Sequence, residues 1–104
     1  MIEHTVTFRL KPTVDRQTEE IFLNAALELS TIPGVQDFAV RQQVSPKNSH
    51  QYGITMNFDS QNEYDEYSAH PRHTEFIHSY WLKYVDDFQE ADFQPLSMSS
   101  RSIS

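Results

Sequence analysis

The chain has 104 residues, no cysteine and a formal net charge of −7 at pH 7. This length suits one domain with a single core, and the acidic balance argues against a nucleic-acid or anionic-membrane partner. The absence of cysteine excludes a disulfide framework, a thiol nucleophile and a thiolate metal site.

The first third of the chain predicts a strand followed by a helix. Residues 2–10 alternate between apolar and polar side chains, the period of a strand, and His4 falls on the apolar side. Pro33 and Gly34 are expected to end the helix and turn the chain. Apolar side chains recur at helical spacing over residues 15–30, and the predicted core face consists of Ile21, Phe22, Ala25 and Leu29, broadened by Leu23, Ala26 and Leu27.

The middle of the chain predicts two strands joined by a hairpin. Alternating side chains mark strands over about residues 38–44 and 52–58, with Val44 on the same face as the preceding apolar residues. Residues 45–49 (Ser-Pro-Lys-Asn-Ser) have the chemistry of a turn. His50 follows in this polar loop, so we expect it to be an ordinary solvent-side or boundary residue.

A second helical region begins at Ser60, because Glu63 three residues later completes a capping box. Pro71 lacks an N–H, which predicts a break before the helix restarts and continues to about Val85. His73 falls on the buried face of this second segment, so its imidazole is expected to point to the interior. The apolar side chains that mark this face are Phe76, Ile77, Tyr80, Trp81 and Tyr84.

A short strand within residues 88–94 completes the order β-α-β-β-α-β, which is typical of the α+β ferredoxin-like fold. The domain is expected to span residues 1–95, with a flexible serine-rich tail over residues 96–104. Both helices should cover one face of the sheet. The other face, with small side chains such as Thr5, Thr7 and Thr55, suits pairing with a second copy, so we expect a homodimer.

Several of these segments resemble the stress-response A/B barrel (Dabb) family. The resemblance covers residues 2–95 and rests on residues 3–11 (Glu-His-Thr-Val-Thr-Phe-Arg-Leu-Lys), residues 32–35 (Ile-Pro-Gly-Val), the pattern Tyr67-x-x-His70-Pro71-x-His73, Trp81 and Asp92-Phe93. It implies a dimeric α/β barrel in which two ferredoxin-like sheets pack face to face. A plant polyketide cyclase similar to this pattern uses a tyrosine and a histidine in a pocket between helices and sheet. The resemblance assigns those roles to Tyr67 and His73, with His4 and His70 as matching histidines.

The local chemistry favours Tyr67, His73 and His4 as catalytic residues. A neutral imidazole accepts a proton near pH 7, and a phenol within reach polarises a carbonyl, which suits enolisation, cyclisation or isomerisation. An acidic segment that includes Glu90 borders the expected pocket mouth. The predicted substrate-binding residues are His70, Trp81 and Phe8.

Three classes of function remain open: a cofactor-free lyase, cyclase or isomerase, a module that binds an apolar or aromatic ligand, and a structural stress protein. The same histidines could instead fix the helix break to the sheet. His4, His70 and His73 complete no recognisable zinc pattern, and two glycines offer no phosphate loop, so we predict no metal and no cofactor. With no apolar run of about 20 residues and no signal core, we expect a cytoplasmic protein without a membrane partner.

Overall fold

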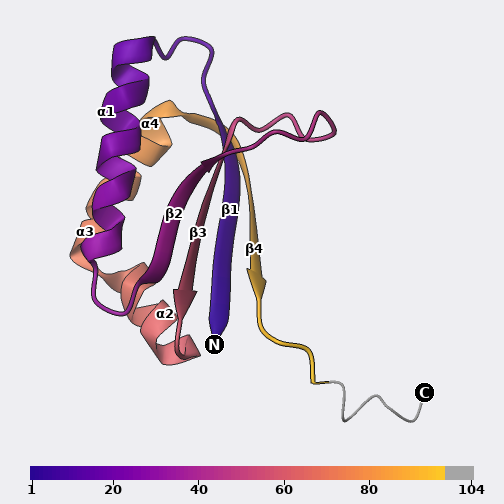
Figure 1. Ribbon diagram of the computed structural model, residues 1–104. Helices are drawn as coiled ribbons and strands as arrows, with labels where there is room; N and C mark the ends of the chain where they lie inside the picture. Colours follow the sequence, from indigo (N-terminus) through magenta and orange to yellow (C-terminus); the bar gives the residue numbers. More distant parts are fainter. Residues whose placement is uncertain (98–104) are drawn as a thin grey trace.

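The computed structural model describes residues 1–97 of the chain (Figure 1). One antiparallel sheet has the strand order β2-β3-β1-β4 and consists of β1 (Ile2–Leu10), β2 (Gln36–Gln42), β3 (Tyr52–Phe58) and β4 (Val85–Phe93). The predicted α+β ferredoxin-like order is therefore confirmed. Most of the serine-rich tail, from position 98 onward, lies outside the described residues.

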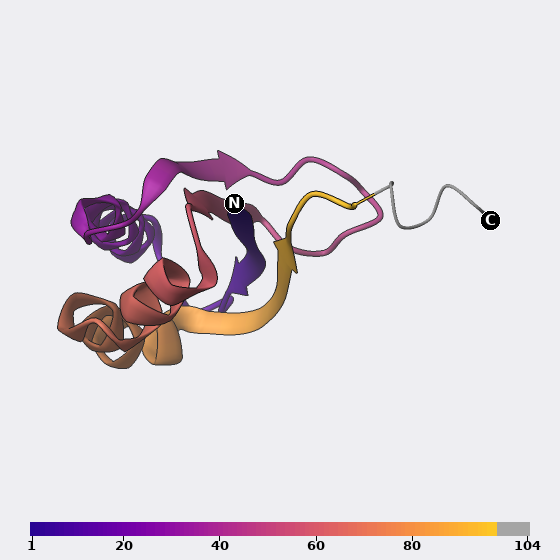
Figure 2. The same ribbon diagram turned by 90° about the horizontal axis from the view of Figure 1, so that it is seen from below.

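The helices lie together on one face of a curved sheet (Figures 1 and 2). The first helical region is α1 (Arg16–Leu27), extended by a 3₁₀ turn, η1 (Glu28–Thr31). The second is divided into α2 (Gln61–Ala69), α3 (Pro71–Phe76), a π-helical turn η2 (Ile77–Trp81) and α4 (Leu82–Tyr84).

Side chains cap these helices where the sequence predicts starts. The Asp15 carboxylate accepts from the backbone N–H of Thr18 at 2.8 Å, and Ser60 accepts from that of Glu63 at 3.3 Å. Pro71 occupies the first turn of α3, where its missing N–H costs no hydrogen bond. Pro71 therefore marks the residue at which the helix restarts after the break.

Three details differ from the sequence prediction. Ile21 and Leu27, which were expected in the core, are 51% and 47% exposed, because α1 faces the sheet through the narrower stripe that contains Phe22 and Ala26. Val44 is exposed because the chain leaves the sheet after β2 ends. The last strand begins at Val85 and is longer than predicted, since it pairs along most of β1.

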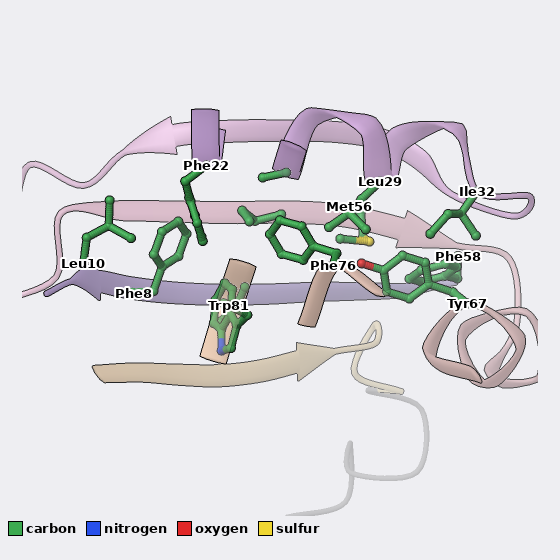
Figure 3. Close-up of a cluster of buried hydrophobic side chains, with 13 residues drawn as sticks. Phe8, Leu10, Phe22, Leu29, Ile32, Met56, Phe58, Tyr67, Phe76 and Trp81 are labelled. Atoms are coloured by element: carbon green, nitrogen blue, oxygen red, sulfur yellow. The ribbon is translucent and has the colours of Figure 1, made fainter. Parts of the chain in front are cut away.

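Aromatic rings fill the space between the sheet and the helices (Figure 3). Trp81 is buried, as its place on the helical stripe predicts, with its ring centroid 5.0 Å from that of Phe8 and 6.2 Å from that of Phe22. Burying large rings supplies much of a small domain's stability. Within residues 1–97, no helix combines the length and the apolar character needed to cross a membrane.

Candidate functional site

A cavity of about 240 Å³ lies between the helices and the sheet. Four of its lining side chains are polar or charged: His4, Tyr67, His73 and Glu90. The remaining lining side chains are apolar and are Val6, Leu29, Ile54, Met56, Phe76, Ile77, Trp81, Leu82 and Phe88. An apolar wall with a few convergent polar groups is the usual form of a small-molecule site.

Strand register brings two carboxylates to the cavity side of the sheet. His4 faces the helices because it alternates with outward-facing residues along β1. In the antiparallel β1–β4 pair, His4 lies opposite Asp92 and Val6 lies opposite Glu90. Because opposite residues share a face, both acidic side chains project beside the cavity.

The first polar cluster joins His4, Asp92 and Tyr64. His4 Nδ1 lies 2.6 Å from Asp92 Oδ1 and 2.8 Å from the Tyr64 hydroxyl oxygen, and that hydroxyl donates to Asp92 Oδ2 at 2.9 Å. A carboxylate only accepts, so we assign the proton of neutral His4 to Nδ1. Burial and the Asp92 carboxylate raise the pKa of Tyr64, which therefore stays protonated. His4 Nε2 bonds to no protein group within residues 1–97 and is left for the cavity.

His73 presents a second imidazole from the first turn of α3. Its Nδ1 lies 3.1 Å from the carbonyl oxygen of Ser68, which only accepts, so Nδ1 carries the proton here as well. Burial lowers the pKa of His73, because the charged imidazolium loses solvation. The ring is therefore neutral at pH 7, with Nε2 as its unprotonated nitrogen.

Tyr67 lies beside both imidazoles. Its ring centroid is 4.8 Å from that of His73 and 6.5 Å from that of His4, and the residue is only 2% exposed. Burial, and secondarily the charge of Glu90, raises the pKa of Tyr67, so the phenol is protonated at neutral pH. No group within residues 1–97 bonds to the hydroxyl, which points toward Met56 and Phe76 in Figure 3. It is available to donate to a ligand.

The other three predicted site residues have different positions. Trp81 lines the cavity from the π-helical turn. His70 caps α3 instead, with Nδ1 accepting from the backbone N–H of Arg72 at 3.1 Å, so it anchors the helix break. Phe8 corrects the prediction that it lines the substrate site: its ring is fully buried beneath Trp81 and does not belong to the cavity wall. Phe8 supports the wall residue rather than facing a ligand.

Tyr64 and Asp92 complete the site, although the residue pattern gave neither of them a role in it. Glu90, expected only at the border of the pocket mouth, lines the cavity itself. Tyr64 lies one helical turn before Tyr67. This spacing fits the apolar edge of a helix as well as it fits a site residue. Asp92 and Glu90 alternate along β4 and would have been found by aligning that strand with β1. That alignment depends on a register between segments more than 80 residues apart.

His50, expected on the solvent side or at the boundary, is also a correction, because its side chain is buried and only 8% exposed. Its Nε2 donates to Asp87 Oδ2 at 2.7 Å, and its Nδ1 accepts from the Thr7 hydroxyl at 2.7 Å. That hydrogen bond lowers the pKa of Asp87. Thr7 belongs to the sheet face that the helices leave uncovered, so this histidine is on the opposite side from the cavity.

The described part of the chain contains no group of three histidine, aspartate or glutamate side chains placed to hold a metal ion. Both His4 and His73 use Nδ1 for protein hydrogen bonds. The cavity chemistry that the described residues offer is therefore that of two imidazoles, a phenol and a carboxylate.

Residues 2–95 match the profile of a family described as Stress responsive A/B Barrel Domain. A Dabb family protein of ferredoxin-like fold from Mesorhizobium loti is 39% identical, with a TM-score of 0.88 over 92% of this chain and 97% of that one. Among curated proteins, none matches the chain significantly in sequence.

Two more distant structures share the fold. A dimeric ferredoxin-like protein of unknown function from Thermobifida fusca is 21% identical, with a TM-score of 0.78 and 90% of each chain covered. A hydroxynitrile lyase from Passiflora edulis is 13% identical, with a TM-score of 0.81 over 92% of this chain and 94% of that one. At these identities the likeness concerns architecture alone.

Proposed function

Because this chain belongs to the stress-responsive A/B barrel (Dabb) family, we propose that it binds an apolar or aromatic small molecule and performs cofactor-free acid–base chemistry on it. The carrying observation is that His4, Tyr67 and His73 line one apolar cavity, with both Nε2 atoms and the phenol free of protein partners within residues 1–97. Such a set suits a cyclase, lyase or isomerase.

The geometry favours His4 as the base. In the proposed step, a C–H next to a substrate carbonyl gives its proton to His4 Nε2, and the electron pair moves onto the carbonyl oxygen. Asp92, bonded to Nδ1, stabilises the imidazolium that forms. Tyr67 donates a hydrogen bond to the developing enolate oxygen, and the reverse proton transfer, or a bond to a second carbonyl carbon, completes the reaction.

His73 has a different proposed role from His4. Within residues 1–97 no carboxylate bonds to the His73 ring, and burial lowers the pKa of His73, so this imidazole carries a positive charge less readily than His4. A neutral imidazole beside Tyr67 can accept a hydrogen bond from a substrate hydroxyl or relay a proton. We therefore place it as a second acceptor that orients the ligand.

A non-catalytic role is the second candidate. The Tyr64–Asp92–His4 cluster joins α2 to β1 and β4, and such a buried polar network also stabilises a fold without chemistry. In that case the protein sequesters its ligand or acts structurally in a stress response. The two candidates differ in whether a bound ketone loses its α-protons.

Deuterium exchange separates these candidates. Acetophenone in D₂O, followed by proton NMR, should lose its methyl signal faster with the protein than with buffer. The exchange should fall at least about 100-fold in His4→Ala, the lower range for losing a general base. Binding without exchange would leave the sequestering role, and neither binding nor exchange would contradict the proposed cavity function.

We also propose that two copies pair through the uncovered sheet face. This face contains the half-buried threonines Thr5, Thr7 and Thr55, and the relative from Thermobifida fusca is described as dimeric. Light scattering should give twice the 12.2 kDa chain mass. Thr55→Lys should shift the protein toward one chain mass, because it buries a positive charge beside Arg41, whose Nε already donates to the Thr55 hydroxyl at 3.3 Å. A wild-type protein at one chain mass at micromolar concentration would contradict the pairing.

A further inference from the structure

The charge of the cavity has one sign. Glu90 is the one carboxylate among the described lining residues. No lysine or arginine of the described chain lines the cavity. The next charge is Asp92, which is also negative and lies directly behind His4.

Glu90 has no basic partner among residues 1–97. Among residues 1–97, the ion pairs involve other carboxylates, such as Asp86 with Arg9 at 3.0 Å. Glu90 is exposed at the rim, on the same face of β4 as Phe88. Its charge reaches the interior, since it contributes to the raised pKa of Tyr67. An unpaired carboxylate at the mouth of an apolar cavity attracts cations and repels anions.

Aromatic faces stand beside this carboxylate. The rings of Trp81 and Phe88 both line the cavity and meet edge to face, with centroids 5.5 Å apart. An ammonium group near such faces gains a cation–π attraction, which is strongest for tryptophan. A protonated amine at the rim would therefore meet a carboxylate and aromatic rings together, while its apolar body fills the cavity.

We propose that Glu90 makes this cavity selective for ligands that join an aromatic or apolar body to a protonated amine. The inference rests on the proposed cavity function and adds the ligand class to it. Neutral analogues bind more weakly, and carboxylates are the poorest ligands. Glu90 is thus a specificity-determining residue on β4, at the cavity rim, apart from the proposed base His4.

Three probes of similar size test this selectivity: 2-phenylethylamine, 2-phenylethanol and phenylacetate. Trp81 is the single tryptophan and lines the cavity, so quenching of its fluorescence reports binding. At neutral pH and low salt, the amine should bind about tenfold more tightly than the alcohol, and the carboxylate most weakly. Added salt should reduce the amine's advantage, because Glu90 is exposed to solvent.

Glu90→Gln should bring the three affinities together. Glu20→Gln is the matched control, because it removes the same charge from an exposed position on α1 that does not line the cavity, and it should keep the order. Equal binding of amine and alcohol to the wild-type protein would overturn the inference and leave the cavity function standing. Failure of all three probes to bind would overturn both. A salt-independent preference, or one that survives in Glu90→Gln, would also overturn the inference.

Discussion

Two histidine–aspartate pairs stand on opposite faces of one sheet. His4 and Asp92 meet at 2.6 Å on the helix-covered face, and His50 and Asp87 meet at 2.7 Å on the uncovered face. The two imidazoles are buried to a similar degree, 6% and 8% exposed. By residue type, distance and burial, the pairs are nearly equivalent.

What differs is the second ring nitrogen. His50 bonds through both ring nitrogens, to Asp87 and to Thr7, and these bonds hold the β2–β3 loop to the sheet. Neither nitrogen remains for a ligand. Within residues 1–97, His4 bonds through Nδ1 alone, and its ring lines a cavity. A buried imidazole bonded to a carboxylate is therefore evidence of a site only when the other ring nitrogen is open to a ligand.

Trp81→Ala removes a wall of the cavity and should have the largest effect on stability. Deleting a large buried ring costs about 3–5 kcal/mol in the free energy of unfolding. The variant should lose the cavity around His4 while the His50 pair keeps its hydrogen bonds. Urea unfolding provides the measurement, and a change below about 1 kcal/mol would mean that the ring is not a core residue.

Replacing each histidine by alanine should separate the two pairs. His4→Ala is expected to lower ketone exchange at least about 100-fold. His50→Ala leaves Thr7 and Asp87 without their partner, so it should lower the unfolding free energy. Its exchange rate per folded molecule should stay at the wild-type level. Equal exchange losses in both variants would remove the distinction between the pairs.

Tyr64→Phe sharpens the comparison further, because among the described residues a tyrosine hydroxyl bonds to the His4–Asp92 pair and none bonds to the His50–Asp87 pair. The change deletes hydrogen bonds to Asp92 and His4 and should cost about 1 kcal/mol in the free energy of unfolding. It should also shift the ¹⁵N resonances of the His4 ring and leave those of the His50 ring unchanged. A stability loss without any change in the His4 resonances would show that Tyr64 only packs.

The pH dependence of stability should carry a small signature of His73. Because its folded pKa lies below the ordinary 6.5, the unfolded chain binds more protons as the pH falls below that value. This contribution therefore destabilises the fold on acidification and vanishes above the ordinary pKa. His73→Gln should show a shallower loss of unfolding free energy between neutral and mildly acidic pH. An unchanged slope would contradict the lowered pKa.

The sequence predicted the cavity-side histidines because short-range periodicity determines them. Alternation along β1 placed His4, and helical spacing after Pro71 placed His73 and Trp81. Their partners depend on long-range register instead. Asp92 meets His4 across 88 residues of sequence, and no local pattern encodes that pairing.

Local patterns also misjudged residues whose burial depends on tertiary contacts. His50 looked like a loop residue, yet the β2–β3 loop folds back so that the ring reaches Thr7 on β1. Phe8 has the alternation of a cavity residue, but the tilted ring of Trp81 packs over it. Such outcomes depend on how elements meet rather than on either element alone.

The distinction between the two pairs rests on which ring nitrogen carries the proton, and NMR of the ¹⁵N-labelled imidazoles tests it directly. Neutral His4 should be protonated at Nδ1 and neutral His50 at Nε2. Adding acetophenone should shift the Nε2 resonance of His4 and leave His50 unchanged. An Nε2–H tautomer at His4, or a ligand response confined to His50, would contradict the account.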